Sequence, residues 1–277
     1  MSPVKHKFAA TINTRTMLYR RMPIEIEAPE GFGYHLIDCN LSESSFTDQK
    51  LGDLDIDLNN LLLQYSDHKG NAALRELVAA DAGFSADDVL ITSGAATALF
   101  IIATSLLEKG DRIVVARPNY ATNIETPRAI GADTGFIDLK FEDGFDINVE
   151  ELERLITPQT KLVSLTYPHN PTGVLLSEDK LGRIIALIEQ KGVYLLMDET
   201  YRVMCFEKKL PVAATLSDRV ISISSMSKSY GLPGIRIGWI ISRNHKLMET
   251  FLAAKEQICI TNSVVDEEIA FKYLAKK

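Results

Sequence analysis

Cysteine is scarce in this chain, and its scarcity excludes two classes of protein. The 277 residues include three cysteines, Cys39, Cys205 and Cys259, which are odd in number, far apart and not in metal-ligand spacing. A disulfide-stabilised secreted domain and a zinc site are therefore not expected. Residues 1–10 lack the apolar core of a secretory leader, and no apolar run approaches the length that spans a bilayer. We expect a cytoplasmic protein with reduced thiols and no membrane partner.

Basic residues are also in deficit. Lysine and arginine number 30 against 37 acidic residues, which gives a formal net charge of −7. Nucleic acids and anionic membranes both require a basic face, so we expect no nucleic-acid partner. Hydrophobic residues make up 46% of the chain and charged residues 24%, which is ordinary for a soluble enzyme with a large core.

The pattern of apolar residues predicts alternating strands and helices. Short apolar runs separated by helical stretches repeat through residues 89–238. Residues 177–191 form a clear crossover helix, because its apolar side chains fall on one face. Such alternation predicts an α/β fold in which a mostly parallel sheet lies between two layers of helices. The apolar positions of the crossover helix are Leu181, Ile184, Ile185 and Ile188.

The most informative segment is the serine-rich loop around Lys228. A predicted strand at 221–223 precedes it, and a second predicted strand at 235–241 follows Gly231, Pro233 and Gly234. Lysine amines form Schiff bases with carbonyl compounds, and pyridoxal 5′-phosphate (PLP) is the commonest such cofactor. Arg236 and the hydroxyls of Ser225 and Ser227 are suited to binding its phosphate. Taken alone, the segment is equally compatible with a solvated loop lysine.

A carboxylate at a second strand end strengthens the cofactor interpretation. Asp198 directly follows the apolar run 192–197, at the edge where α/β sheets gather their ligands. A carboxylate beside the pyridine nitrogen of PLP would keep that nitrogen protonated. Tyr201, three residues on, would hydrogen-bond the ring hydroxyl. Without Lys228, the simpler interpretation would be that Asp198 caps the next helix.

Three further strand ends carry groups suited to the same cofactor. Gly94, Ala95 and Ala96 open a helix after a strand, where exposed backbone N–H groups and the helix dipole favour a phosphate. Tyr120 follows another strand and would stack on the pyridine ring, unless it is ordinary packing. The stiff Asn170-Pro171-Thr172-Gly173 turn aims the Asn170 amide from a third strand end.

Together these motifs resemble the class I/II aminotransferases, the fold-type I PLP-dependent enzymes. The order of the motifs follows that family without inversion, and the resemblance covers roughly residue 59 to the end of the chain. It implies that Asn170 hydrogen-bonds the cofactor ring oxygen and that Tyr65 reaches the phosphate bound by a neighbouring subunit. The expected assembly is therefore a homodimer with shared active sites.

The resemblance also implies a division of the chain. Residues 1–58 would form an N-terminal arm and substrate-side segment, 59–250 the PLP-binding large domain, and 251–277 helices leading to a small domain that is apparently missing. The chain has no match for the small-domain arginine that binds the substrate α-carboxylate. Where relatives have a small glycine-containing turn, residues 40–45 read Asn-Leu-Ser-Glu-Ser-Ser. Glu43 there would meet a cationic substrate group or, as the simpler interpretation, lie solvated in a loop.

The function that the resemblance implies is transfer of an amino group between an L-amino acid and a 2-oxo acid, in amino-acid metabolism. Lys228 would hold PLP as a Schiff base and, once released, carry the proton between the substrate carbon and the cofactor, while Asp198 and Tyr201 assist. A β-lyase, a decarboxylase or a cyclising synthase would use the same residues. A non-catalytic PLP-binding regulatory module is a further alternative, although the segment before Tyr65 is short and acidic for a DNA-binding domain.

Overall fold

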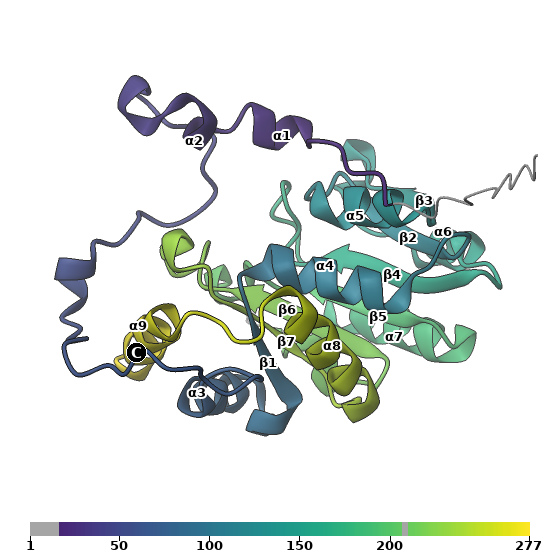
Figure 1. The fold of residues 1–277 in the computed structure, drawn as a ribbon. Coiled ribbons are helices and arrows are strands. Elements are labelled where there is room, and N and C mark those ends of the chain that lie inside the picture. Colours follow the sequence, from purple (N-terminus) through teal and green to yellow (C-terminus); the bar gives the residue numbers. More distant parts are fainter. Residues whose placement is uncertain (1–16, 207–209) are drawn as a thin grey trace, which may run out of the picture.

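The computed structural model describes residues 17–206 and 210–277 (Figure 1). Residues 1–10, to which the expectation about a leader refers, lie outside the described residues, as does the start of the predicted N-terminal arm. No helix within the described part is long and apolar enough to cross a bilayer.

A mixed sheet forms the centre of the molecule, and the described residues contribute seven strands to it in the order β1-β7-β6-β5-β4-β2-β3. Strands β2 to β6 pair in parallel, whereas β7 runs antiparallel to both β1 and β6. The prediction of a mostly parallel sheet is confirmed. The bounds are β1 Val89–Thr92, β2 Arg112–Arg117, β3 Asp133–Asp138, β4 Thr160–Thr166, β5 Tyr194–Asp198, β6 Val220–Ser225 and β7 Gly238–Ile241.

Two strands differ from the sequence-based expectation. The last strand was expected from residue 235, but it begins at Gly238, because Pro233–Ile235 form a 3₁₀ turn and Arg236 takes a left-handed φ of 47°. The edge strand β3 was not identified at all. Its sequence, Asp-Thr-Gly-Phe-Ile-Asp, has little apolar alternation and so resembles a loop. In the structure the strand is only partly buried.

Helices cover both faces of the sheet, as the three-layer α/β/α prediction requires. The crossover helix α7 lies where expected; Ser177 caps its first turn by accepting from the Lys180 N–H, and Gly192 ends it in the left-handed region. The helix bounds are α1 Pro23–Ile26, α2 Pro29–Phe32, α3 Ala72–Ala82, α4 Ala95–Leu106, α5 Thr122–Ile130, α6 Val149–Leu155, α7 Glu178–Lys191, α8 His245–Ile258 and α9 Val264–Ala275.

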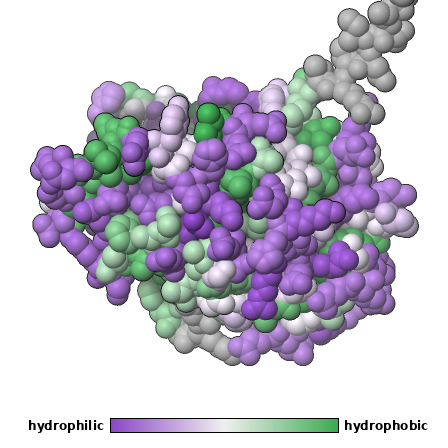
Figure 2. Space-filling model, turned by 60° about the horizontal axis from the view of Figure 1, so that its bottom comes forward, coloured by the Kyte–Doolittle hydropathy of each residue, from purple (hydrophilic) through white to green (hydrophobic). Residues whose placement is uncertain are grey.

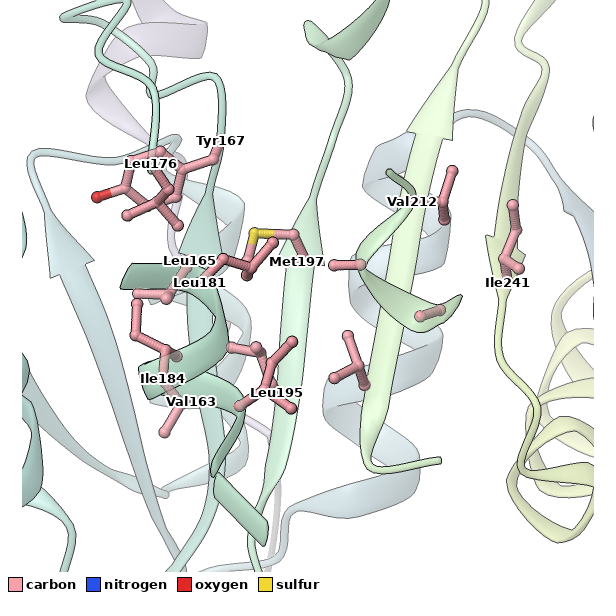
Figure 3. Close-up of a cluster of buried hydrophobic side chains, with 14 of the residues drawn as sticks. Val163, Leu165, Tyr167, Leu176, Leu181, Ile184, Leu195, Met197, Val212 and Ile241 are labelled. Atoms are coloured by element: carbon pink, nitrogen blue, oxygen red, sulfur yellow. The ribbon is translucent and has the colours of Figure 1, made fainter. Parts of the chain in front are cut away.

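The core consists of two apolar layers, one on each face of the sheet. Successive strand residues alternate between them: Leu195 belongs to the layer beneath α7, and Leu196 to the layer beneath α4 and α8. Figure 3 shows Val163, Leu165 and Met197 in the first layer, packed towards Leu181 and Ile184 of α7. Burial of each such side chain contributes about 1.5–3 kcal/mol, so these layers hold the strand ends rigidly.

The two helices that follow the last strand pack against the rest of the molecule. α8 packs against α4 and β1, and its Phe251 is fully buried in the layer beneath it. Helix α9 packs against α3 (Figure 1), and its Ala270 is buried. The domain boundary near residue 250 stays a prediction.

The N-terminal segment, residues 17–66, is built differently from the sheet. It contains only short turns of helix and runs from α1 and α2 around the outside of the sheet, as Figure 1 shows in purple and blue. Many of its apolar side chains are exposed, among them Leu18, Phe32, Leu36 and Leu41. On the face of the molecule in Figure 2, hydrophilic residues predominate and apolar patches interrupt them.

Candidate active site

Most of the predicted site residues lie at the carboxyl edge of the sheet. Asp198 ends β5, Ser225 ends β6, and Gly94 follows β1 at the start of α4. The pairing of Thr166 with Asp198, at the last positions of β4 and β5, brings the two strand ends level. Parallel strands collect their carboxyl ends along one edge, which explains why residues far apart in sequence converge here.

Lys228 contacts a residue of the N-terminal segment. Its Nζ lies 2.7 Å from Oε1 of Glu43, and about a third of each side chain is exposed. Burial alone would lower the pKa of Lys228, but the hydrogen bond and negative charge of Glu43 outweigh it and raise this pKa. Burial likewise opposes ionisation of Glu43, yet the Lys228 ammonium lowers the pKa of its carboxyl. Glu43 is therefore not the solvated loop carboxylate that the sequence favoured.

Asp198 is a buried carboxylate without a positive partner among the described residues. Its Oδ1 accepts hydrogen bonds from the Thr200 N–H at 3.1 Å and the Thr200 hydroxyl at 2.6 Å. Burial raises the pKa of Asp198, and the two bonds from Thr200 oppose that rise. The sequence-based alternative, a helix cap, is not observed, since only a 3₁₀ turn at Arg202–Met204 follows. A cationic ring nitrogen would compensate for the desolvation of this carboxylate.

A small polar cradle forms where α4 begins. Arg236 donates to the Ser227 hydroxyl at 3.1 Å and to the Pro233 carbonyl at 2.9 Å. Its guanidinium lies so close to Gly94 that a Cβ there would be 2.3 Å from Nη2. A Cβ on Gly238 would be 2.8 Å from the Ala95 nitrogen, so two glycines allow the helix start to approach the arginine. The N–H groups of Ala95 and Ala96 belong to this helix start.

Tyr120, Tyr201 and Asn170 are the other predicted cofactor-binding residues near this edge, and each has its own set of neighbours. The Tyr120 hydroxyl donates to Glu25 at 3.2 Å, and the Tyr201 hydroxyl lies 2.8 Å from the Ser44 hydroxyl. Asn170, Tyr201 and Ser44 line one cavity of about 520 Å³. The contacts of Glu25 with Tyr120 and of Ser44 with Tyr201 are not predicted from the sequence, because no local pattern marks them.

Tyr65 lies apart from this group. It is mostly exposed and lines a second cavity, of about 450 Å³, between residues 57–66 and α9. Its predicted role at a neighbouring subunit's phosphate stays a prediction. His169, in contrast, is buried and structural: its ring nitrogens contact the Thr172 hydroxyl at 2.7 Å and the Pro118 carbonyl at 2.9 Å.

Known proteins are similar to this chain in sequence and in fold. The family model described as aminotransferase class I and II matches residues 41–270. The chain belongs to that family. One curated relative is the arginine–pyruvate transaminase of Pseudomonas aeruginosa, 32% identical over 64% of this chain and 47% of its own length. Another is a probable N-acetyl-LL-diaminopimelate aminotransferase of Bacillus subtilis, 33% identical over 64% of this chain and 47% of its own length.

A solved structure extends the match. A PLP-dependent aminotransferase from Streptococcus suis superposes with a TM-score of 0.84 at 27% identity, covering 92% of this chain and 71% of that one. The aspartate aminotransferase of Thermotoga maritima gives a TM-score of 0.73 at 28% identity, over 77% of this chain and 59% of that one. The chain spans about half the length of the curated aminotransferases named above.

PLP is the cofactor of this aminotransferase family, and the residues present fit it. The cradle of Gly94, Ser227 and Arg236 offers a guanidinium, a hydroxyl and a helix start to a phosphate. The buried Asp198 carboxylate lacks a positive partner among the described residues and suits a protonated ring nitrogen. Lys228 supplies the amine.

Proposed function

We propose that this chain forms the large part of a PLP-dependent aminotransferase that moves an amino group between an L-amino acid and a 2-oxo acid. The observation that carries the proposal is the placing of three chemically distinct groups along one sheet edge: the Lys228 amine, the buried Asp198 carboxylate and the cradle at Arg236. Each suits a different part of one cofactor. Family membership supports the same conclusion.

Each residue has a separate task in this proposal. When bound, PLP withdraws electrons from the substrate carbon that bears the amino group. Asp198 holds the proton on the cofactor's ring nitrogen, because its buried negative charge favours the protonated form. The phosphate would be bound by the side chains of Arg236, Ser225 and Ser227 and by the helix start that follows Gly94, where the N–H groups of Ala95 and Ala96 lie. These contacts would fix the cofactor's orientation.

Lys228 first holds the cofactor through its amine and later, as a free amine, moves a proton at the substrate carbon. Tyr120 would stack on the ring, and Asn170 and Tyr201 would hydrogen-bond its oxygen. Tyr120 and Tyr201 are already held by hydroxyl contacts to Glu25 and Ser44. These contacts orient the two rings before any ligand arrives.

We further propose a cytoplasmic homodimer in which Tyr65 reaches the partner's phosphate. The exposed apolar side chains of the N-terminal segment, among them Leu62, Leu63 and Tyr65, would be covered in such an assembly. Residues 59–250 would then be the PLP-binding domain. The arginine named for the Pseudomonas aeruginosa relative makes basic amino acids worth including among the donors to be tested.

A different fate for the substrate carbanion would use the same residues, so β-lyase, decarboxylase and cyclising activities remain alternatives. The deciding experiment is the visible absorption spectrum of the PLP-loaded protein before and after a pool of L-amino acids is added. We expect the band of lysine-bound cofactor to convert to the pyridoxamine form. A band that never converts would favour another PLP chemistry or a non-catalytic PLP-binding regulatory module. Release of β-elimination products or carbon dioxide would replace transamination by a lyase or decarboxylase activity.

A further inference from the structure

The ion pair between Glu43 and Lys228 is not explained by the roles assigned so far. The two residues are 185 positions apart in the sequence, yet Glu43 Oε1 lies 2.7 Å from Lys228 Nζ. Within residues 17–206 and 210–277, Glu43 is the only carboxylate in contact with this ammonium. The other titratable groups that face Lys228 are phenols, those of Tyr34, Tyr120 and Tyr201. The charge balance at Lys228 therefore depends on Glu43.

Main-chain contacts fix this carboxylate beside the lysine. The Phe46 N–H donates to the Lys228 carbonyl at 3.2 Å, and the Gln49 N–H donates to the Gly231 carbonyl at 3.0 Å. Residue 231 must be glycine for this approach, because a Cβ there would lie 2.5 Å from the Thr47 carbonyl oxygen. Residues 46 and 49 are thus bonded to residues 228 and 231 of the lysine loop, which places Glu43 beside Lys228.

The Glu43 side chain is also oriented locally. The Ser44 N–H donates to Glu43 Oε1 at 2.8 Å, and the Ser44 hydroxyl lies 2.8 Å from the Tyr201 hydroxyl. The same oxygen therefore accepts from Lys228 and from its own neighbour. A carboxylate held by two donors in a partly desolvated position keeps its negative charge.

We propose that Glu43 is the counter-ion of the Lys228 nitrogen, holding a proton on it in the cofactor-free chain and when it is linked to the cofactor. This role rests on the proposed function and makes Glu43 a positioning residue that acts through Lys228. A protonated nitrogen draws electrons from the carbon to which it is linked, and this is the carbon that the amine of a substrate must attack. By holding this proton, Glu43 would make that carbon more reactive towards the substrate amine, which replaces the Lys228 nitrogen there.

The test is an absorption titration of the PLP-loaded protein across the pH range in which its bands interconvert. The midpoint reports the pKa of the Lys228 nitrogen. An opposite charge at this distance shifts a pKa by about one unit or more. We expect Glu43→Gln to lower the midpoint by about that amount, and Glu43→Asp to give an intermediate value because it keeps the charge on a shorter side chain. Glu27→Gln removes an exposed carboxylate from the same segment and should leave the midpoint unchanged.

A second measurement does not depend on the cofactor. The acetylation rate of Lys228 in the cofactor-free chain, followed by mass spectrometry against pH, reports the pKa of the free amine. We expect Glu43→Gln to lower that midpoint too. An unchanged midpoint in either measurement overturns the counter-ion role. A wild-type protein that shows no lysine-bound cofactor band would instead refute the proposed function, and the acetylation profile would still decide the role of Glu43.

Discussion

The carboxyl edge of the sheet and the N-terminal segment meet at Lys228, but they are built in different ways. Asp198 lies at the end of a strand whose neighbours on both sides are hydrogen-bonded, and it is 5% exposed. Glu43 lies in an irregular segment in which Leu41 is 95% exposed. Asp198, which suits the cofactor, thus belongs to a rigid scaffold. Glu43, which raises the pKa of Lys228, comes from a segment held by a few main-chain bonds.

The two carboxylates show the same contrast in their ionisation. Burial raises the pKa of Asp198, since the hydrogen bonds from Thr200 only partly offset its desolvation. The Lys228 ammonium lowers the pKa of Glu43. Asp198 therefore gains from a cation that arrives with the cofactor, and Glu43 already has one. Asp198 is therefore suited to binding a cation, whereas Glu43 raises the pKa of the Lys228 amine that it contacts.

The largest effect should come from the rigid side. Asp198→Asn keeps the shape and can still accept from Thr200, but it removes the charge that stabilises a protonated ring nitrogen. We expect turnover to fall about a hundredfold or more, the usual scale for losing one preorganised electrostatic group. Steady-state rates at saturating cofactor would check this, with the cofactor band as evidence of folding. If the rate is unchanged, Asp198 has no part in the mechanism.

A buried neighbour of Asp198 makes the rigid side sensitive to pH. Burial raises the pKa of Glu199 from 4.5 to about 7, although it accepts from the Ala213 N–H at 2.8 Å. Because the folded pKa is the higher one, the stability contribution is complete below pH 4.5 and is lost as the pH rises through about 7.

We therefore expect the free energy of unfolding of the wild type to fall, relative to Glu199→Gln, by up to about 3 kcal/mol over that pH range. Glutamine keeps an oxygen acceptor for Ala213 but cannot ionise. Urea denaturation of both proteins at several pH values would measure the difference. Parallel curves with no pH-dependent gap would show that Glu199 titrates normally.

The smallest effect should come from the N-terminal segment, and two matched glycines isolate it. Gly231 and Gly144 have φ values of 65° and 64°, but a Cβ meets the Thr47 carbonyl at 2.5 Å in the first and nothing within 4 Å in the second. Gly144→Ala should cost about 1–2 kcal/mol from backbone strain alone. Gly231→Ala should also release residues 43–49, giving faster proteolysis within them. Equal proteolysis of the two variants would show that the segment is not fastened at Gly231.

The sequence predicted the scaffold better than the segment for a physical reason. Apolar runs ending in Asp198 or in the serines around Lys228 carry local signals, because a buried strand followed by polar residues has few other interpretations. The Glu43–Lys228 pair links residues 185 positions apart, and nothing near Glu43 encodes its partner. Gly238 was missed although a glycine in a strand marks a close approach of another backbone. The half-exposed strand β3 lacked the alternation that would have revealed it.

The central claim is that Lys228 is the residue that holds PLP. Borohydride reduction of the PLP-loaded protein, followed by peptide mass spectrometry, would fix the cofactor to its lysine and identify it. The account predicts a phosphopyridoxyl group on the peptide that contains Lys228 and no labelling of that peptide in Lys228→Ala. Stoichiometric labelling of another lysine, or none in the wild type, would contradict it.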